Sequence, residues 1–443
     1  MKLTIKHGMS KRRLFRINSS GLSLQQSYTC TEFADLALIL FLASPLTQTL
    51  FSALFNPGVL SQTISISLCY IPALIICVLN PRKYFIIDFW ILLGLVGVFF
   101  AVTLFFHSDY LPYYTQEEYG LWDYVLKPNR GIYGYFFVRL VNDPKRILKD
   151  TKCAGWMMFV YFAHRIIQAK QRGYWNGVAG DDGHVKMTYS VAFGYEVLLF
   201  AAVFLYSALK EKKIQDWFAA GLATVMILVG GSRGPILFLV VTVVLFILTE
   251  LKNSKHKWKI IAAVSTVMIL MQLYLIRFLE FVSSIMNRFG ASSRFIEKLL
   301  SDDISNDSGR DKIWAAAIDM IKDKPLGHGA YGARHVIVNY IIAGYPHNVF
   351  LEILIEFGIV FGTILILFLL IGAYNMIFGK YAGQFRSIFL PLFCASCALF
   401  VSLTFWGYRP FWLCIALGVC FINNRKRRAL DIESICASGG IVS

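Results

Sequence analysis

The stretch Ser283–Gly362 organises this chain, and it closes on the sequence GYPHNVFLEILIEFGIVFG from Gly344 to Gly362. Before that close it is long and polar, and it carries the pattern SGRDKIW from Ser308 to Trp314. Apolar runs flank it on both sides. Because a chain made mostly of apolar helices does not need such an insertion in order to fold, we interpret this stretch as the functional part.

The composition is that of a membrane protein. Of the 443 residues, 57% are hydrophobic, whereas soluble domains average about 45–50%. Repeated apolar runs are long enough to cross a bilayer, and backbone groups in lipid must form their hydrogen bonds within the segment. The sequence therefore predicts an all-α polytopic bundle of about 11–12 transmembrane spans with a long, partly helical extracytoplasmic loop.

The formal charge of +16 is distributed as expected for cytoplasmic loops. Basic residues gather in the tails and in short connections between apolar runs, as at Arg82–Lys83, Lys210–Lys213, Lys252–Lys259 and Arg425–Arg428. Positive residues in short loops mark the cytoplasmic side. We therefore predict no nucleic-acid partner, and we place both termini in the cytoplasm.

One further crossing is needed to bring the basic segment Lys145–Lys152 to the cytoplasmic side. Gly131–Val141 is the candidate, and it is too short to span comfortably, so we expect it to be tilted, surrounded by thinned bilayer, or re-entrant. The predicted organisation is a cytoplasmic tail at 1–32, a first bundle part at 33–279, an extracytoplasmic catalytic loop at 280–347, a second bundle part at 348–423 and a cytoplasmic tail at 424–443.

Two other outer connections have two readings each. His107–Arg130 is rich in tyrosine and acidic residues. That pattern favours an interfacial aromatic belt, and a platform for saccharides is the alternative. The GDDG sequence at Gly180–Gly183 favours a solvated turn over a divalent-cation site.

Arg233 lies in a turn of glycine, serine and proline between two apolar runs. An arginine at a membrane boundary is often an anchor that extends toward water. Here, however, Gly231, Ser232 and Gly234 leave backbone amides open at a helix N-terminus. Such amides together with a guanidinium form an anion site that suits phosphate.

Arg310 repeats this arrangement in the long loop. Asp307 or Ser308 is expected to cap a helix that ends at Lys324–Pro325. An apolar stripe predicts that this helix lies along the membrane surface; its members are Ile313, Trp314, Ala317, Ile318 and Ile321. An ion pair with Asp307 or Asp311 is the alternative role for Arg310. Two arginines at helix N-termini on one side of the membrane favour phosphate binding.

His347 follows Pro346 at the start of an apolar run. At a helix N-terminus near arginines its protonated form is disfavoured, and a neutral imidazole is what a general base requires. His328, in a glycine-rich turn, is the competing candidate. Glu352 and Glu356 are expected to be structural, paired with Arg165 or Arg277, because carboxylates inside a membrane are usually paired.

The order of these motifs resembles the O-antigen polymerase and ligase family. The motifs are GSRGP from Gly231, SGRxxxW from Ser308, PLGHGAYG from Pro325 and HNVFLEILIEFG from His347. The resemblance implies that the arginine of the SRG turn, the arginine of the loop and the histidine of HN are functional, and these are Arg233, Arg310 and His347. Gly231, Ser232, Gly234, His328 and Asn348 are then substrate-binding candidates.

The resemblance also implies a metal-independent glycosyltransferase without a cofactor. Its donor would be an undecaprenyl-diphosphate-linked oligosaccharide. Its place would be the bacterial inner membrane, with the active loop facing the periplasm. A chain-length regulator protein and a flippase are implied as partners, beside the lipid bilayer.

Three activities remain open at this point. A polymerase of repeat units is favoured, because variable outer loops suit diverse repeat units. A ligase that transfers the glycan to a lipid A core would use the same signature. A flippase for lipid-linked glycans would be expected to spread cationic residues along the interior of several helices, whereas the arginines singled out here lie at helix ends.

Overall fold

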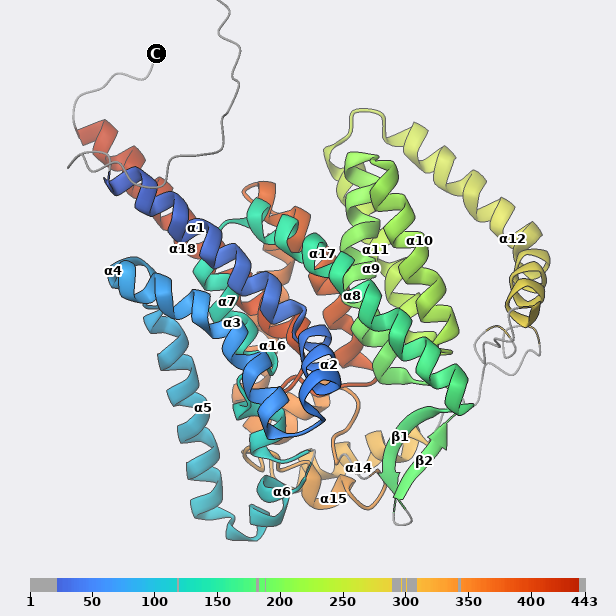
Figure 1. Ribbon diagram of the computed structural model, residues 1–443, viewed down its shortest axis with the longest axis horizontal. Coiled ribbons are helices and arrows are strands. Elements are labelled where there is room, and N and C mark those ends of the chain that lie inside the picture. The colour runs from blue at the N-terminus through green and yellow to red at the C-terminus, as the bar shows by residue number, and fades with distance from the viewer. Residues whose placement is uncertain are drawn as a thin grey trace, which may run out of the picture.

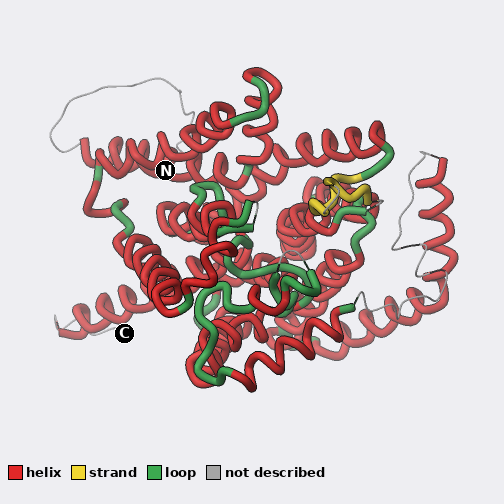
Figure 2. Tube along the Cα trace, turned by 90° about the horizontal axis from the view of Figure 1, so that it is seen from below, coloured by secondary structure: helices red, strands yellow, loops and turns green. Residues whose placement is uncertain are grey.

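The computed structural model describes residues 22–117, 119–180, 183–187, 189–288, 296, 300, 309–341 and 344–437. Figures 1 and 2 show the elements of the chain packed as a helical bundle. The elements of the first half are α1 (Leu22–Leu42), α2 (Ser44–Phe55), α3 (Val59–Leu79), α4 (Pro81–Tyr84), α5 (Ile87–Phe106), η1 (Ser108–Tyr110), α6 (Leu111–Thr115), η2 (Trp122–Leu126), α7 (Gly131–Val141), α8 (Pro144–Arg172), β1 (Trp175–Gly180) and β2 (Gly183–Met187). Those of the second half are α9 (Val191–Glu211), α10 (Ile214–Val229), α11 (Arg233–Asn253), α12 (Lys257–Arg288), α14 (Arg310–Asp323), α15 (Arg334–Ile337), α16 (Val349–Phe378), α17 (Gly383–Ser396), η3 (Cys397–Phe400) and α18 (Arg409–Ala437).

The prediction of a helical membrane bundle is confirmed, but fewer helices than expected qualify as spans. Within the described residues, six helices are long and apolar enough to cross a membrane, or seven if the bent pair α1–α2 counts as one span. The expectation was about 11–12 spans. Two of the other expected spans are helical but fall short: α10 has 16 residues, and α8 carries lysine and arginine near both ends. α10 is therefore too short, and α8 too charged, to qualify as a membrane span.

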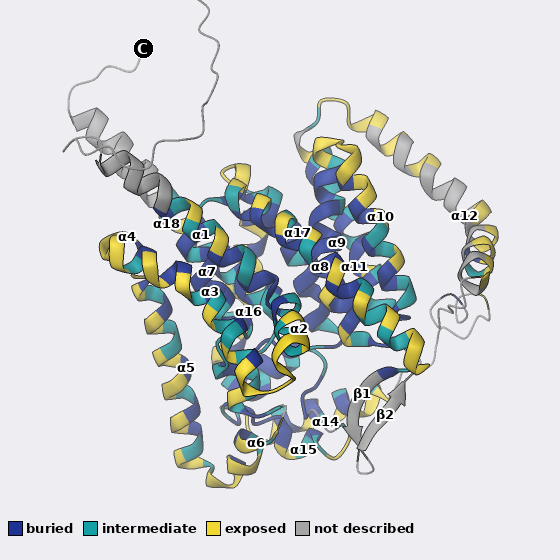
Figure 3. Cartoon of the chain, viewed as in Figure 1, coloured by how far each residue is buried: buried dark blue, intermediate teal, exposed yellow. Residues whose placement is uncertain are grey.

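The core lies around α8, α9 and α17, as the dark blue of Figure 3 shows. In α9 78% of the apolar window is buried in the protein, against 22% in α5. α9 is therefore a central helix and α5 a peripheral one. Buried phenylalanines and small residues of α9 pack directly on α10, α11 and α17.

The predicted short crossing at Gly131–Val141 forms helix α7 with those bounds. It is enclosed by protein rather than by thinned bilayer, since most of its residues are buried. Tyr70, in the middle of α3, donates a hydrogen bond to the Pro128 carbonyl at 2.8 Å. The chain just before α7 therefore already lies inside the bundle. Non-helical backbone at such depth is tolerated where protein surrounds it.

Connections that were predicted to share one side of the membrane lie together in space. Arg82, Lys83, Arg146 and Asn423 line a common cavity. At the other end, Tyr114 of α6 donates to the Ala330 carbonyl at 3.1 Å. Figure 1 shows α6, α14 and α15 at the lower end, opposite the link between α11 and α12. This arrangement fits the predicted sidedness.

Two outer segments differ in part from the prediction. Ile313 and Ala317 of the apolar stripe of α14 pack with Ile355 of α16, whereas Ile318 is exposed. An antiparallel hairpin, β1–β2, flanks the GDDG sequence at which a turn was expected. The two aspartates of the GDDG sequence lie outside the described residues.

The tyrosine-rich connection is also more buried than an interfacial belt would be. Tyr110 and Tyr114 are buried in a cluster with Phe100 and Tyr331. In that cluster they pack the connection His107–Arg130 against the turn before α15. Trp122, in contrast, is exposed.

Candidate functional site

The turn Pro346–Asn348 is fixed from three directions. Asn348 caps α16: its side-chain oxygen accepts hydrogen bonds from the backbone N–H of Phe350 at 3.0 Å and of Leu351 at 3.3 Å. The indole Nε1 of Trp314, on α14, donates to the Pro346 carbonyl at 3.0 Å. Between these anchors His347 adopts a φ of +53°, which is a left-handed conformation that costs a non-glycine residue free energy. The orientation of this imidazole is therefore held at a cost in folding free energy.

The imidazole of His347 is held in one tautomer. Its Nδ1 lies 2.9 Å from the Ser402 carbonyl, and a carbonyl oxygen can only accept, so Nδ1 carries the proton. Burial, together with the nearby Arg310 guanidinium, lowers the pKa of His347 to about 4 even though the Ser402 contact opposes this shift. The ring is therefore neutral at pH 7, with a lone pair on Nε2. That is the state a general base needs.

Arg310 stands at the first position of α14, after Gly309, which has a φ of +73°. It is half-buried and interacts electrostatically with His347 and with Tyr195 of α9. Among the described residues it forms no ion pair with Asp311, and Asp307 lies outside them. A cation at a helix N-terminus opposes the helix dipole, so a bound anion would relieve both charges.

The turn Gly230–Gly234 packs against the start of α9. A Cβ atom at Gly194 would lie 3.0 Å from the Ser232 Cβ, and a Cβ at Gly234 would collide with the Tyr195 hydroxyl. Gly231 has a φ of +70°. The glycines of this turn are thus required for close approach and for backbone conformation, and they bring Arg233 next to Tyr195.

Tyr195 links the three predicted residues. It adjoins the turn that carries Arg233, and it interacts with Arg310 and with Ser402, the residue that orients His347. Sequence reasoning missed Tyr195, because a single tyrosine in an apolar helix resembles an ordinary core residue. The structure therefore brings three features close to one phenol: the turn that carries Arg233, the Arg310 guanidinium, and Ser402, whose carbonyl holds His347.

His328 lies elsewhere. It is buried, its Nε2 is 2.9 Å from the Met320 carbonyl, and its backbone N–H donates to the Ile355 carbonyl at 2.7 Å. Burial lowers the pKa of His328. These contacts join the turn before α15 to α14 and α16, and none of them reaches His347 or Arg310. A substrate contact from His328 stays a prediction.

The partners expected for Glu352 and Glu356 were wrong. Glu356 accepts hydrogen bonds from the Trp406 indole at 3.0 Å and from the Tyr331 backbone N–H at 3.1 Å. Glu352 accepts from the Thr404 hydroxyl. These carboxylates therefore tie α16 to two loops through neutral donors rather than through an arginine.

The two arginines expected to pair with them lie elsewhere. Arg165 donates to the Tyr161 hydroxyl at 2.7 Å, and Arg277 is exposed. Within the described residues, no three His, Cys, Asp or Glu side chains are grouped so as to hold a metal ion.

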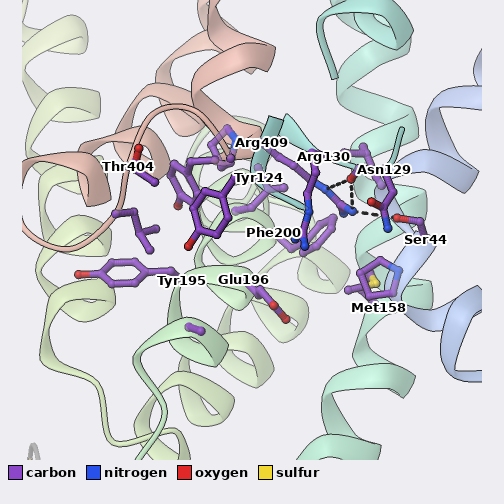
Figure 4. Close-up of a pocket in the computed structure, with 18 of the residues that line it drawn as sticks. Ser44, Tyr124, Asn129, Arg130, Met158, Tyr195, Glu196, Phe200, Thr404 and Arg409 are labelled. Carbon is purple, nitrogen blue, oxygen red and sulfur yellow. Dashed lines mark hydrogen bonds between the residues drawn. The ribbon is translucent and has the colours of Figure 1, made fainter. Parts of the chain in front are cut away.

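A cavity of about 350 Å³ extends from Tyr195 into the bundle. Figure 4 shows Tyr195 and Thr404 at one side of it and Arg130, Asn129 and Arg409 at the other. Tyr195 thus lines this cavity and also interacts with Arg310.

Comparison with known proteins supports the family resemblance in the second half of the chain. Residues 218–367 match the family model described as O-antigen ligase. The matched segment contains Arg233, Arg310 and His347, and it does not contain Arg130, Tyr195 or Arg409. No curated protein and no solved structure matches the chain.

Proposed function

We propose that this chain, which carries a domain of the O-antigen ligase family at residues 218–367, is a polymerase of lipid-linked glycans. It would join undecaprenyl-diphosphate-linked oligosaccharide repeat units at the outer face of the inner membrane. The observation that carries the glycan-transfer part of this proposal is the pair formed by a neutral, tautomer-fixed His347 and Arg310 within the matched domain; the choice of a polymerase rests on the variable outer loops. Such a pair supplies a base beside a cation.

In the proposed reaction the donor diphosphate binds at Arg233 and Arg310. An acceptor sugar hydroxyl attacks the anomeric carbon of the donor glycan and forms a new C–O bond. The bond from that carbon to the diphosphate breaks, and its electron pair leaves with the diphosphate. The hydroxyl proton passes to Nε2 of His347 and from there to solvent or to the departing diphosphate.

Stabilising the charge on the leaving diphosphate is expected to lower the reaction barrier more than removing the hydroxyl proton does. Each charge-assisted hydrogen bond from an arginine contributes roughly 1.5–3 kcal/mol, and such contacts act most where charge develops in the transition state. Proton removal by His347 adds a factor of roughly 10²–10⁴. A bound diphosphate also raises the pKa of His347, because a nearby anion favours the imidazolium. The base therefore becomes stronger when the donor is in place.

A ligase and a flippase are the rival assignments. The flippase criterion of interior cationic residues is met in part, since Arg130 and Arg409 line the interior cavity. The family domain, however, belongs to glycan-transferring enzymes, which favours an enzyme. The arrangement around His347 suits either a polymerase or a ligase.

Deletion of the gene tests the proposal when the surface polysaccharide is then run on a gel. We expect a single repeat unit attached to the lipid A core, because transfer persists while polymerisation stops. Full-length polymer left on carrier lipid would identify a ligase instead. Single units retained inside the cell would identify a flippase.

A further inference from the structure

Three breaks in the helices meet at the cavity of Figure 4. α1 and α2 are bent by 71° at Ala43, α7 begins at Gly131 after Arg130, and α18 begins at Arg409. Ser44, Asn129, Arg130 and Arg409 all line the cavity. The N-terminal ends of α2, α7 and α18 therefore converge on one space.

These helix ends lie within the bundle rather than at its surface. The segment before α7 is held by Tyr70 in the middle of α3, and Arg409 donates to the Asn129 carbonyl at 2.8 Å. Half-helices that begin inside a membrane protein direct the positive ends of their dipoles at the ligand site, and anionic groups bind there. The backbone alone thus favours an anion in this cavity.

The side chains add an excess of positive charge. Glu196 faces the cavity and interacts electrostatically with Arg165, Arg409 and Arg130. Among the described residues, none of these arginines forms an ion pair with Glu196 or with another carboxylate. Three guanidinium groups against one carboxylate leave a surplus of two positive charges around the cavity.

The two lining arginines are not equivalent. Arg409 is fixed, because it donates to the Ser44 hydroxyl at 2.9 Å and to the Asn129 carbonyl. Arg130 is half-buried, and its Nε is buried without a hydrogen-bond partner among the described residues. A guanidinium donor that is shielded from water without an acceptor costs free energy, and a bound anion would supply an acceptor for this Nε.

We propose that this cavity is a second diphosphate site, and that it holds the diphosphate of the acceptor glycan lipid. The proposal rests on the polymerase function, in which both substrates are lipid-diphosphate-linked glycans. Arg233 and Arg310 hold the donor diphosphate beside His347, so the acceptor diphosphate needs a place of its own. We call the proposed donor site at Arg233, Arg310 and His347 the outer site. Tyr195 lines the cavity and interacts with Arg310 of the outer site. A cavity of this size falls in the range of roughly 300–1,000 Å³ usual for ligand sites.

Calorimetric titration of the detergent-purified full chain with farnesyl diphosphate tests the site. The Arg233→Ala, Arg310→Ala double variant serves as the background, because it removes the outer site. In that background Arg130→Gln is expected to weaken binding about 10- to 100-fold through loss of a charge-assisted contact. Glu196→Gln is expected to strengthen binding, since Glu196 is the one carboxylate among the described residues that line the cavity.

The control for charge is Lys210→Gln, which removes one exposed cation paired with Glu250 at 3.0 Å. It is expected to leave farnesyl diphosphate binding unchanged. An affinity for farnesyl diphosphate that is unchanged in both Arg130→Gln and Glu196→Gln overturns the proposal. So does weaker binding with Glu196→Gln.

A kinetic measurement distinguishes the acceptor from the donor. With purified protein and separate donor and acceptor lipids, Arg130→Gln is expected to raise the KM for the acceptor and to leave the KM for the donor unchanged. A rise in the donor KM alone overturns the assignment to the acceptor. An inactive wild-type protein whose diphosphate binding still depends on Arg130 would contradict the polymerase function and leave the diphosphate site standing.

Discussion

The outer site and the inner cavity are built in different ways. The outer site takes Arg233, Arg310 and His347 from the starts of α11 and α14 and from the turn before α16, all inside the matched family segment. The cavity takes Arg130 and Arg409 from helix starts outside that segment. The two proposals therefore place the chemistry in the matched segment and the recognition of a second substrate in the rest of the chain.

The two regions also hold their cations differently. In the outer site an arginine lies beside a neutral base whose position is fixed by a helix cap and a carbonyl. In the cavity, arginines lie beside the carboxylate of Glu196, and no histidine is among the described lining residues. Variants of the outer site should therefore change the rate of the chemical step, and variants of the cavity should change binding.

The largest effect is expected from His347. His347→Ala and His347→Gln each remove the proton acceptor, so the rate of polymer formation should fall by roughly 10²–10⁴, while farnesyl diphosphate still binds. The measurement is polymer made per minute by purified protein. His256→Gln, on the exposed link before α12, is the matched control and should keep the full rate. Equal rates for His256→Gln and His347→Gln would remove His347 from the mechanism.

The next largest effect is expected from Arg233 and Arg310, which are proposed to bind the donor diphosphate. Arg233→Ala or Arg310→Ala should lower kcat/KM for the donor by about 10- to 150-fold each, through loss of a charge-assisted contact of roughly 1.5–3 kcal/mol. Lysine at either position should restore only part of the activity, because bidentate contact is lost. Steady-state kinetics at fixed acceptor measures this. A wild-type kcat/KM for the donor in both alanine variants would contradict donor binding at Arg233 and Arg310.

The pH dependence should be smaller and have a defined sign. Because the pKa of His347 is lowered to about 4, the base form is present throughout pH 5–8, and kcat/KM should fall only as the pH drops through about 4. The loss should then approach tenfold per pH unit. A fall centred near the ordinary histidine value of about 6.5 would show that the catalytic base has a more solvated environment than His347.

The smallest effect is expected from the cap. Asn348→Ala removes two hydrogen bonds to the first turn of α16 and should cost about 1 kcal/mol of stability. Because this cap also fixes the turn that holds His347, kcat should fall a few-fold while the donor KM is unchanged. Asn348→Asp keeps the acceptor oxygen and should restore kcat. Equal kcat values for the alanine and aspartate variants would separate the cap from catalysis.

The sequence was sufficient to place the residues of short polar motifs at helix starts. Arg233 and Arg310 each stand at the start of a helix after a glycine or serine, and Asn348 is a preferred cap residue; these local signals need no tertiary information. The bounds of α7 were also correct, since arginine and asparagine flank an apolar run. The residues proposed for the outer site could therefore be named from the sequence, and their roles stay predictions.

The cavity could not be found in this way. Arg130 and Arg409 follow polar or aromatic loops, and a loop between apolar runs is expected at the membrane surface. Their depth depends on long-range contacts, such as that of Tyr70 with the Pro128 carbonyl, which no local pattern records. The same holds for Glu356, whose partner is the Trp406 indole rather than a charge.

The division between chemistry and binding is tested most directly by single-turnover kinetics of the purified protein at increasing concentrations of acceptor lipid. Arg130→Gln should need more acceptor but should reach the wild-type rate at saturation. His347→Gln should level off roughly 10²–10⁴ below that rate at any acceptor concentration. A His347→Gln protein that reaches the wild-type plateau would contradict the account, because the chemical step would then not depend on this imidazole.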